Sequence, residues 1–453
     1  MLRSFRVANH RSIRDEAELL LLPAYDKSRP VVPVAGIFGA NASGKSNLLD
    51  GLSFMMTAVR TSYGRWEAGT GVPRSPHRLS AVCLAEPSRF EVDLVVDDIQ
   101  YTYGFVADDE AILEEWLFSY PHRRKSVIFE RNGNHIELGS TLSERRSRTE
   151  LLTGLTRDNS LLLAAAVQAK QAEVVPVYDW FRRGLRFTRN RAKRQVPLHV
   201  AERVEMAMSR HDAFVELLRV ADLGIVDVRV DTVEMPPPRY LDVENQRASE
   251  ELDALREKMS TASGSDEPLL AARIERLGRL IERNRLPVIR KELVFLHGRD
   301  SVPLGLSEQS DGTVAWLELI ALALDALADG TVAVVDEIDA SLHPRLTARL
   351  IELFRNKISN RQHAQLLFTT HDANLLSTSF GDEILGRDEI WFVEKDKDGA
   401  TTLFPLTDFH PRKQENTERR YLGGSYGAVP AVFSDTLVDR LNELASENRD
   451  ASS

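Results

Sequence analysis

The chain has 453 residues, of which 43% are hydrophobic and 28% charged, proportions that suit a globular protein with a large core. Its net charge of -10 excludes a global field that attracts nucleic acid or membranes, so any such binding must be local. The single cysteine, Cys83, excludes an internal disulfide and a cysteine-based zinc site, and no apolar run approaches a membrane span. We therefore expect a cytoplasmic protein that binds no membrane.

The amino-terminal part contains several strand-like runs, the last of which is VVPVAGIF. An abrupt glycine turn and a helix follow it. The helix is predicted because apolar residues recur on one face at helical spacing: Leu48, Leu49, Leu52, Met55, Met56 and Val59. From about residue 89 to 130 the chain consists of short runs rich in Val, Tyr and Phe. These runs predict an antiparallel sheet attached to the core.

The middle of the chain is dominated by helical patterns. They are interrupted by a basic stretch, Arg182–Arg194, in which seven of thirteen residues are Lys or Arg and none is acidic. Two apolar stripes separated by STASGSDEP then predict an antiparallel helical hairpin with helices of roughly 30 Å. The first stripe consists of Ala248, Leu252, Leu255 and Met259, and the second of Leu270, Ile274, Leu277 and Ile281. Such a hairpin either packs within the body of the protein or projects as an arm.

The last third returns to alternating strands and helices. TVAVV is short, apolar and β-branched, as expected of a parallel strand buried on both faces. A helix is expected at about 344–357, then the strand QLLFTT, and a hairpin made of EIWFVEK and TTLFPL. We expect three parts: an amino-terminal half of a head (1–160), a helical insertion (161–290), and a carboxyl-terminal half of the head with a tail (291–453).

The strongest motif is GANASGKS, residues 39–46, which has the spacing of a phosphate loop between a strand and a helix. Its glycines allow backbone N–H groups to turn toward phosphate oxygens, and the helix N-terminus favours negative charge. Lys45 is expected to reach the β- and γ-phosphates of ATP, and Ser46 to bind Mg²⁺.

A second motif, VAVVDEID, places two carboxylates at the end of a buried strand. A carboxylate there is costly unless it meets a metal or a donor, and ligands collect at the carboxyl ends of parallel strands. We expect Asp336 to hold the Mg²⁺ shell and Glu337 to accept a proton from the attacking water.

A third buried strand, LLFTT, ends in His371, at the edge where Asp336 and Glu337 are expected. A lone histidine is more often structural. Its place on the same edge favours a role in sensing the γ-phosphate or positioning water.

GANASGKSN, VAVVDEID, ASLHP and FTTHD occur in this order and at long separation, and the chain thereby resembles ATPase heads of the ATP-binding-cassette type, such as SMC-like and RecF-like proteins. The resemblance implies an α/β P-loop NTPase fold with an antiparallel β subdomain and a helical insertion. FRVANHRSI resembles the first strand of such heads and implies that Arg11 lies near the nucleotide. The matching phosphate-loop positions are Gly39, Asn41, Gly44, Lys45, Ser46 and Asn47.

By the same resemblance LSEQSDGT is a divergent signature motif, in which Asp311 separates Ser310 from Gly312. In such heads the signature cannot reach the phosphate loop of its own chain. The resemblance therefore implies a head-to-tail homodimer, or a higher homo-oligomer, in which Ser310 and Gly312 complete the site of the partner protomer.

More narrowly, the chain resembles the AAA-family ATPases of bacterial anti-phage and abortive-infection systems, of the RloA and AbiL type and more distantly the PARIS ATPase. The segments that carry this resemblance are PSRFEV, YTYGF, EEWLF, QSDGT, DEIDASLHP, EIWFVEKD and RRYLGGSYGAVP. This implies a separate effector protein, a nuclease or toxin. Two alternatives stay open: a RecF-like or SMC-like DNA-repair ATPase, and a nuclease of the overcoming-lysogenization-defect type with Glu394 in its site. The basic stretch Arg182–Arg194 is the candidate contact for DNA or RNA.

Overall fold

The computed structural model describes residues 1–139, 146–189, 211–221, 224–261, 267–377, 383–412 and 415–429. The chain divides into two units: residues 1–193 with 318–453, and residues 194–317. None of the helices in these described ranges is both long enough and apolar enough to cross a membrane.

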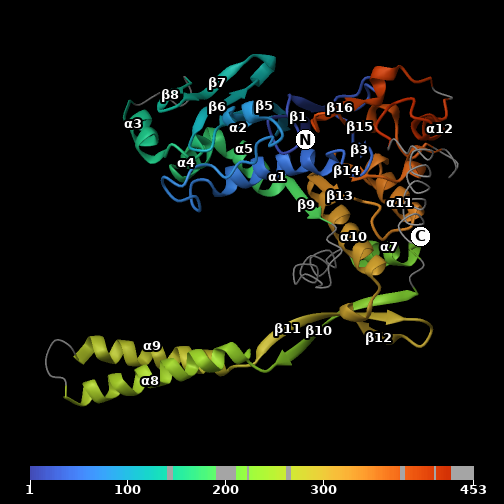
Figure 1. The fold of residues 1–453 in the computed structure, drawn as a ribbon. Helices are drawn as coiled ribbons and strands as arrows, with labels where there is room; N and C mark the ends of the chain where they lie inside the picture. The colour runs from blue at the N-terminus through green and yellow to red at the C-terminus, as the bar shows by residue number, and fades with distance from the viewer. Residues whose placement is uncertain are drawn as a thin grey trace, which may run out of the picture. The chain divides into compact units, whose positions relative to one another are not determined.

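A mixed sheet of six strands is the centre of the first unit (Figure 1). All neighbouring strands are parallel except β15 and β16, which form an antiparallel hairpin at one edge of the sheet. In spatial order the strands are β16 (Thr401–Pro405), β15 (Ile390–Lys395), β3 (Val34–Phe38), β14 (Gln365–Thr370), β13 (Val332–Asp336) and β9 (Leu185–Arg189). The three central strands β3, β14 and β13 are buried almost throughout and have apolar middles, as expected when helices or another sheet cover both faces.

A second sheet in this unit is antiparallel throughout and has seven strands. Its order is β2 (Ala17–Leu20), β1 (Leu2–Ala8), β4 (Ser88–Val96), β5 (Ile99–Ala107), β6 (Ile112–Ser119), β7 (Ser126–Asn132) and β8 (His135–Leu138). The buried side chain of Gln365 joins the two sheets, because it accepts from the backbone N–H of Leu2 at 2.6 Å and donates to its carbonyl at 2.8 Å.

Helix α1 (Lys45–Thr61) contributes to the core that both sheets share. Its buried face carries the apolar stripe expected from the sequence, with Leu48, Leu52 and Met55 each at most 2% exposed. Burial of each such side chain is worth roughly 1.5–3 kcal/mol, so α1 is held firmly at the end of β3. The other helices of this unit are α2 (Ala81–Ala85), α3 (Arg146–Leu155), α4 (Leu162–Gln168), α5 (Val175–Asp179), α11 (Pro344–Arg355) and α12 (Thr417–Leu422).

The second unit contains a three-stranded antiparallel sheet and a helical hairpin. The sheet has β10 (Ile225–Met235), β11 (Val288–His297) and β12 (Val302–Gly305), with α7 (His211–Val220) beside β10. Between β10 and β11 the chain forms α8 (Arg239–Thr261) and α9 (Glu267–Arg285), which pack side by side through Ala248, Leu252 and Ile281 (Figure 1). Helix α10 (Asp311–Asp329) begins in this unit and continues into the first.

The fold class expected from the sequence is confirmed: a P-loop α/β core, an antiparallel β subdomain and a helical hairpin insertion. One strand was not expected. Residues 185–189, inside the basic stretch, form the edge strand β9 parallel to β13. Two cations of that stretch are already paired, Arg182 with Asp179, and Arg186 with Asp325 and Asp329 of α10. Residues 190–194 lie outside the described part of the chain.

The α8–α9 hairpin can be tested as a module. Met235 pairs with Val288, so a two-residue Asn-Gly turn in place of residues 236–287 is expected to close β10 on β11 directly. We expect the main thermal unfolding transition, followed by circular dichroism, to shift by less than about 3 °C, which corresponds to roughly 1 kcal/mol. A fall of ~10 °C or more would show that the hairpin supports the core of the first unit.

Candidate nucleotide-binding and catalytic site

The three motifs of the first unit meet at one edge of the six-stranded sheet. The phosphate loop follows β3, the carboxylates Asp336 and Glu337 end β13, and His371 follows β14. These three strands are neighbours and parallel, so their carboxyl ends lie together. That edge is where ligands bind in open α/β sheets.

The phosphate loop is held by neighbouring segments. Gly44 has φ +107°, and a Cβ atom there would lie 2.1 Å from Thr401 Oγ1, so glycine is needed for both conformation and space. Thr401 Oγ1 lies 2.8 Å from the carbonyl of Ser43 and 2.7 Å from Ser12 Oγ. Asn47 donates to the same Ser12 hydroxyl at 2.6 Å. The β15–β16 hairpin and the segment after β1 thus brace the loop.

Lys45 is the first residue of α1, and its ammonium group donates to the carbonyls of Gly39 and Ala40 at 2.7 and 2.9 Å. Burial lowers the pKa of Lys45, and attraction by the carboxylates of Asp339, Glu337 and Asp336 opposes that shift. The lysine therefore lies at the centre of the loop with three carboxylates near it. Asn41, another residue of the loop, is exposed.

Two oxygen atoms at this edge suit a magnesium ion. Ser46 Oγ lies 2.9 Å from Asp336 Oδ1, and a hydroxyl and a carboxylate are ligands that Mg²⁺ accepts together with waters and phosphate oxygens. Among the described residues no group of three or more His, Cys, Asp and Glu side chains could hold a metal by itself. The donor set therefore fits an ion shared with a phosphate rather than a cage made by protein alone.

Thr369, at the end of β14, was missed in the sequence. Its buried hydroxyl donates to Asp336 Oδ1 at 2.6 Å and accepts from the backbone N–H of Glu337 at 2.7 Å. The N–H of Ile338 also donates to the carbonyl of Thr369 at 3.0 Å. Glu337 adopts φ +55°, which is uncommon for a residue with a side chain, and these contacts hold it there. A single threonine thus holds the carboxylate of Asp336 and the backbone of Glu337.

Arg11 lines the same cavity as Asp336, and its expected place near the nucleotide stays a prediction. Its guanidinium binds the carboxylate of Asp50 on α1, with one contact at 3.2 Å, and the buried His10 ring contacts the same carboxylate at 3.0 Å. Burial alone raises the pKa of Asp50, but the bonds from His10 and Arg11 outweigh it and lower that pKa to about 2. A cavity of about 200 Å³ is lined by Arg11, Asp50, Ser46, Asp336 and Thr188, among others.

Ser310 and Gly312 belong to the second unit, whereas the phosphate loop belongs to the first. Ser310 is exposed and caps α10: its hydroxyl accepts from the N–H of Thr313 at 3.1 Å and lies 2.8 Å from Thr313 Oγ1. Gly312 is the second residue of the helix. The roles expected for these two residues stay predictions, as do those of the other site residues.

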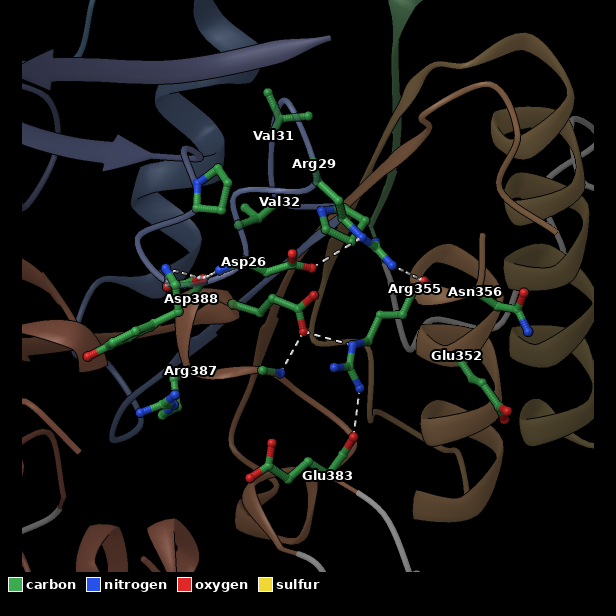
Figure 2. A pocket seen from close by; sticks show the side chains of 15 residues that line it. Asp26, Arg29, Val31, Val32, Glu352, Arg355, Asn356, Glu383, Arg387 and Asp388 are labelled. Carbon is green, nitrogen blue, oxygen red and sulfur yellow. Dashed lines mark hydrogen bonds and ion pairs between the residues drawn. The ribbon is translucent and has the colours of Figure 1, made fainter. Parts of the chain in front are cut away.

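A larger cavity, of about 420 Å³, lies at the opposite edge of the sheet, where residues 31–33 lead into β3 and residues 386–389 lead into β15 (Figure 2). The arginines that line it are engaged within the chain. Arg355 binds the buried Glu389 at 2.9 Å and the carbonyl of Glu383 at 2.6 Å, and Arg387 lies over the ring of Tyr25. We assign no chemistry to this cavity.

The topology and the cluster at the carboxyl edge define a P-loop nucleotide-binding head of the ATP-binding-cassette type. The chain belongs to the family described as "AAA domain, putative AbiEii toxin, Type IV TA system", whose model matches residues 34–377. No curated protein has a significant match to it.

Solved structures similar to the chain include two Smc heads. One is the Smc head bound to the C-winged-helix domain of ScpA, with 12% identity over 90% of this chain and 99% of that chain and a TM-score of 0.39. The other is the Smc head domain with an extended coiled coil bound to the C-terminal domain of ScpA, derived from Pyrococcus furiosus, with 12% identity over 90% and 97% and a TM-score of 0.35.

The role of Thr369 can be tested with an isosteric change. Thr369→Val removes the hydroxyl that orders Asp336 and Glu337, so we expect Mg²⁺ to strengthen the binding of a fluorescent ATP analogue roughly tenfold less than in the parent chain. Thr369→Ser keeps the hydroxyl and serves as the matched control. Equal Mg²⁺ dependence in the Val and Ser variants would contradict this role.

The ion pair between the half-buried Arg355 and the buried Glu389, at the opposite edge, gives a test of stability. Burial raises the pKa of Glu389 and Arg355 opposes the rise, so without Arg355 the folded chain prefers the protonated carboxyl still more strongly. We expect Arg355→Met to lower the free energy of unfolding by about 3 kcal/mol at pH 8 and by less at pH 5, where the carboxyl takes up a proton. Urea unfolding at both pH values measures this, with Arg355→Met/Glu389→Gln as control. A loss independent of pH would refute it.

Proposed function

We propose that the chain is an ATPase that hydrolyses ATP to ADP and phosphate and uses the cycle as a switch. The observation that carries this proposal is the cluster at the end of β13 and β14, where Thr369 fixes Asp336 beside Ser46 and orients the backbone of Glu337. A carboxylate pair held in this way beside a phosphate loop suits a metal-assisted attack of water on the γ-phosphate.

Each residue has a distinct task in this proposal. The backbone of the loop from Gly39 to Gly44, with Asn41 and Asn47, surrounds the phosphates, and Lys45 turns from the loop carbonyls to the β- and γ-phosphates. Ser46 and Asp336 hold Mg²⁺, which neutralises phosphate charge when bound. Glu337 takes a proton from the attacking water, His371 contacts the γ-phosphate, and Arg11 faces the nucleotide from the side of Asp50.

A second copy of the chain completes the site in this proposal. Ser310 is exposed at the N-terminus of the 19-residue helix α10, a position from which a hydroxyl, the helix dipole and the small Gly312 can face a phosphate. We propose that two chains associate head to tail, so that ATP lies between the loop of one and the signature of the other. ATP then stabilises the closed pair by mass action, and hydrolysis releases it.

The family description names a putative AbiEii toxin and a Type IV TA system. From this and from the sequence resemblance to the RloA and AbiL type, we propose a role in abortive infection or anti-phage defence. We propose that the switch controls a separate effector, a nuclease or toxin. The repair-ATPase alternative shares this site and differs only in the partner. A nuclease in this chain is less well supported, because the Glu394 carboxylate accepts the N–H of Ala428 at 3.2 Å, in the turn that contains Gly427.

Substitution of the proposed general base tests the switch. Glu337→Gln keeps the shape of the side chain but cannot take a proton, so we expect ATP turnover to fall by roughly 10²–10⁴-fold while ATP binding persists. The variant should then accumulate with ATP as a dimer, measured by light scattering after size-exclusion chromatography. A chain that stays monomeric with ATP bound would count against the closed pair.

Ser310→Arg supplies the matched comparison, made in the Glu337→Gln background. The site within one chain is untouched, so the affinity of the monomer for ATP should stay unchanged, but the arginine should block the partner's phosphates from the signature and prevent the dimer. Loss of ATP binding by the monomer would show instead that Ser310 acts within its own chain.

A further inference from the structure

Asp339, three residues beyond Asp336, carries a buried carboxylate to which no role has been assigned. Its side chain is 6% exposed. One oxygen, Oδ2, lies 3.1 Å from Nδ1 of His371, and the other, Oδ1, is buried with no hydrogen-bond partner among the described residues. A buried carboxylate is unfavourable unless it is paired, so its position at the catalytic edge requires an explanation.

The backbone around Asp339 leaves it little freedom. The N–H of Ala340 donates to the carbonyl of Glu337 at 3.0 Å, and the N–H of Leu342 donates to the carbonyl of Asp339 at 3.2 Å. Ser341 has φ +65°. Because Ile338 is also bonded to Thr369, the turn that carries Asp339 is tied to the strand that ends next to His371.

The histidine is less constrained. Its side chain is 58% exposed, and Asp339 is the hydrogen-bonding partner that the described residues give its ring. A carboxylate facing Nδ1 favours the form with a proton on that nitrogen, which leaves Nε2 available to another group. The Asp339 carboxylate also lies near the phosphate loop, because its charge attracts the ammonium of Lys45 and opposes the lowering of that group's pKa by burial.

We propose that Asp339 is a positioning residue: it holds the ring of His371 with Nδ1 protonated and Nε2 turned to the nucleotide. The expected effect of Asp339 on ATP turnover rests on the proposed ATPase function, but the contact between Asp339 and His371 does not depend on that function. The imidazole is 58% exposed while the carboxylate is 6% exposed, so the contact mainly fixes the orientation of the ring.

The tautomer of His371 is the first readout, because it requires no catalysis. Long-range ¹H–¹⁵N spectra of the full chain labelled at histidine report which ring nitrogen carries the proton, and His371→Gln assigns the signal. We expect a proton on Nδ1 in the parent chain and in Asp339→Asn, whose amide oxygen still accepts, and a shift to Nε2 in Asp339→Leu. Asp372→Asn, at the next residue, is the matched control and should match the parent.

The second readout is a double-mutant cycle on ATP turnover. If Asp339 acts through His371, Asp339→Leu and His371→Gln each lower kcat by roughly 10–10²-fold, and the double variant is no slower than His371→Gln alone. Asp339→Asn should stay within about threefold of the parent.

Additive losses in the double variant, or a proton on Nε2 in the parent chain, would overturn the proposal. A parent chain that hydrolyses no ATP would refute the proposed function instead, and the tautomer would still decide the pairing of Asp339 with His371.

Discussion

The rest of the site depends on the hydrogen bonds of the Thr369 hydroxyl. It bonds to Asp336 on one side and to the backbone of Glu337 on the other, and so connects the end of β14 to the end of β13. The connection is possible because the two strands are parallel neighbours in register, with Val335 opposite Phe368. The middle of each strand is apolar and buried, and the polar groups that form the site lie where the strands end.

The motifs could be located from the sequence because each combines a buried strand with a polar turn. The GANASGKS loop, DEID and the histidine after FTT all lie at the carboxyl edge, as expected, and the helical hairpin follows its two apolar stripes. Thr369 and Asp339 were not found. A threonine at a strand end and an aspartate in a turn are common, and only the three-dimensional pairing with Asp336, Glu337 and His371 distinguishes them.

The edge strand β9 was missed for a different reason. Its five residues alternate apolar and polar side chains, Leu185 and Phe187 with Arg186 and Thr188, but the alternation is hidden in a run of cations. In the fold two of its polar side chains serve α10: Arg186 pairs with Asp325 and Asp329, and Thr188 donates to Glu318. Charge that suggested a nucleic-acid surface is therefore partly used to attach a strand to a helix.

The position of Lys45 has a consequence for the thermodynamics of ligand capture. A lysine side chain carries about 2 kcal/mol of rotamer entropy, which an exposed lysine loses when it engages a phosphate. Here the carbonyls of Gly39 and Ala40 already restrict the chain, inside a loop that Thr401 and Ser12 brace. Much of that entropy is therefore lost during folding rather than on binding. The affinity of the loop for phosphate is then set mainly by the enthalpy of exchanging two carbonyl contacts of Lys45 for contacts with phosphate oxygens, and only a small entropic cost of ordering remains.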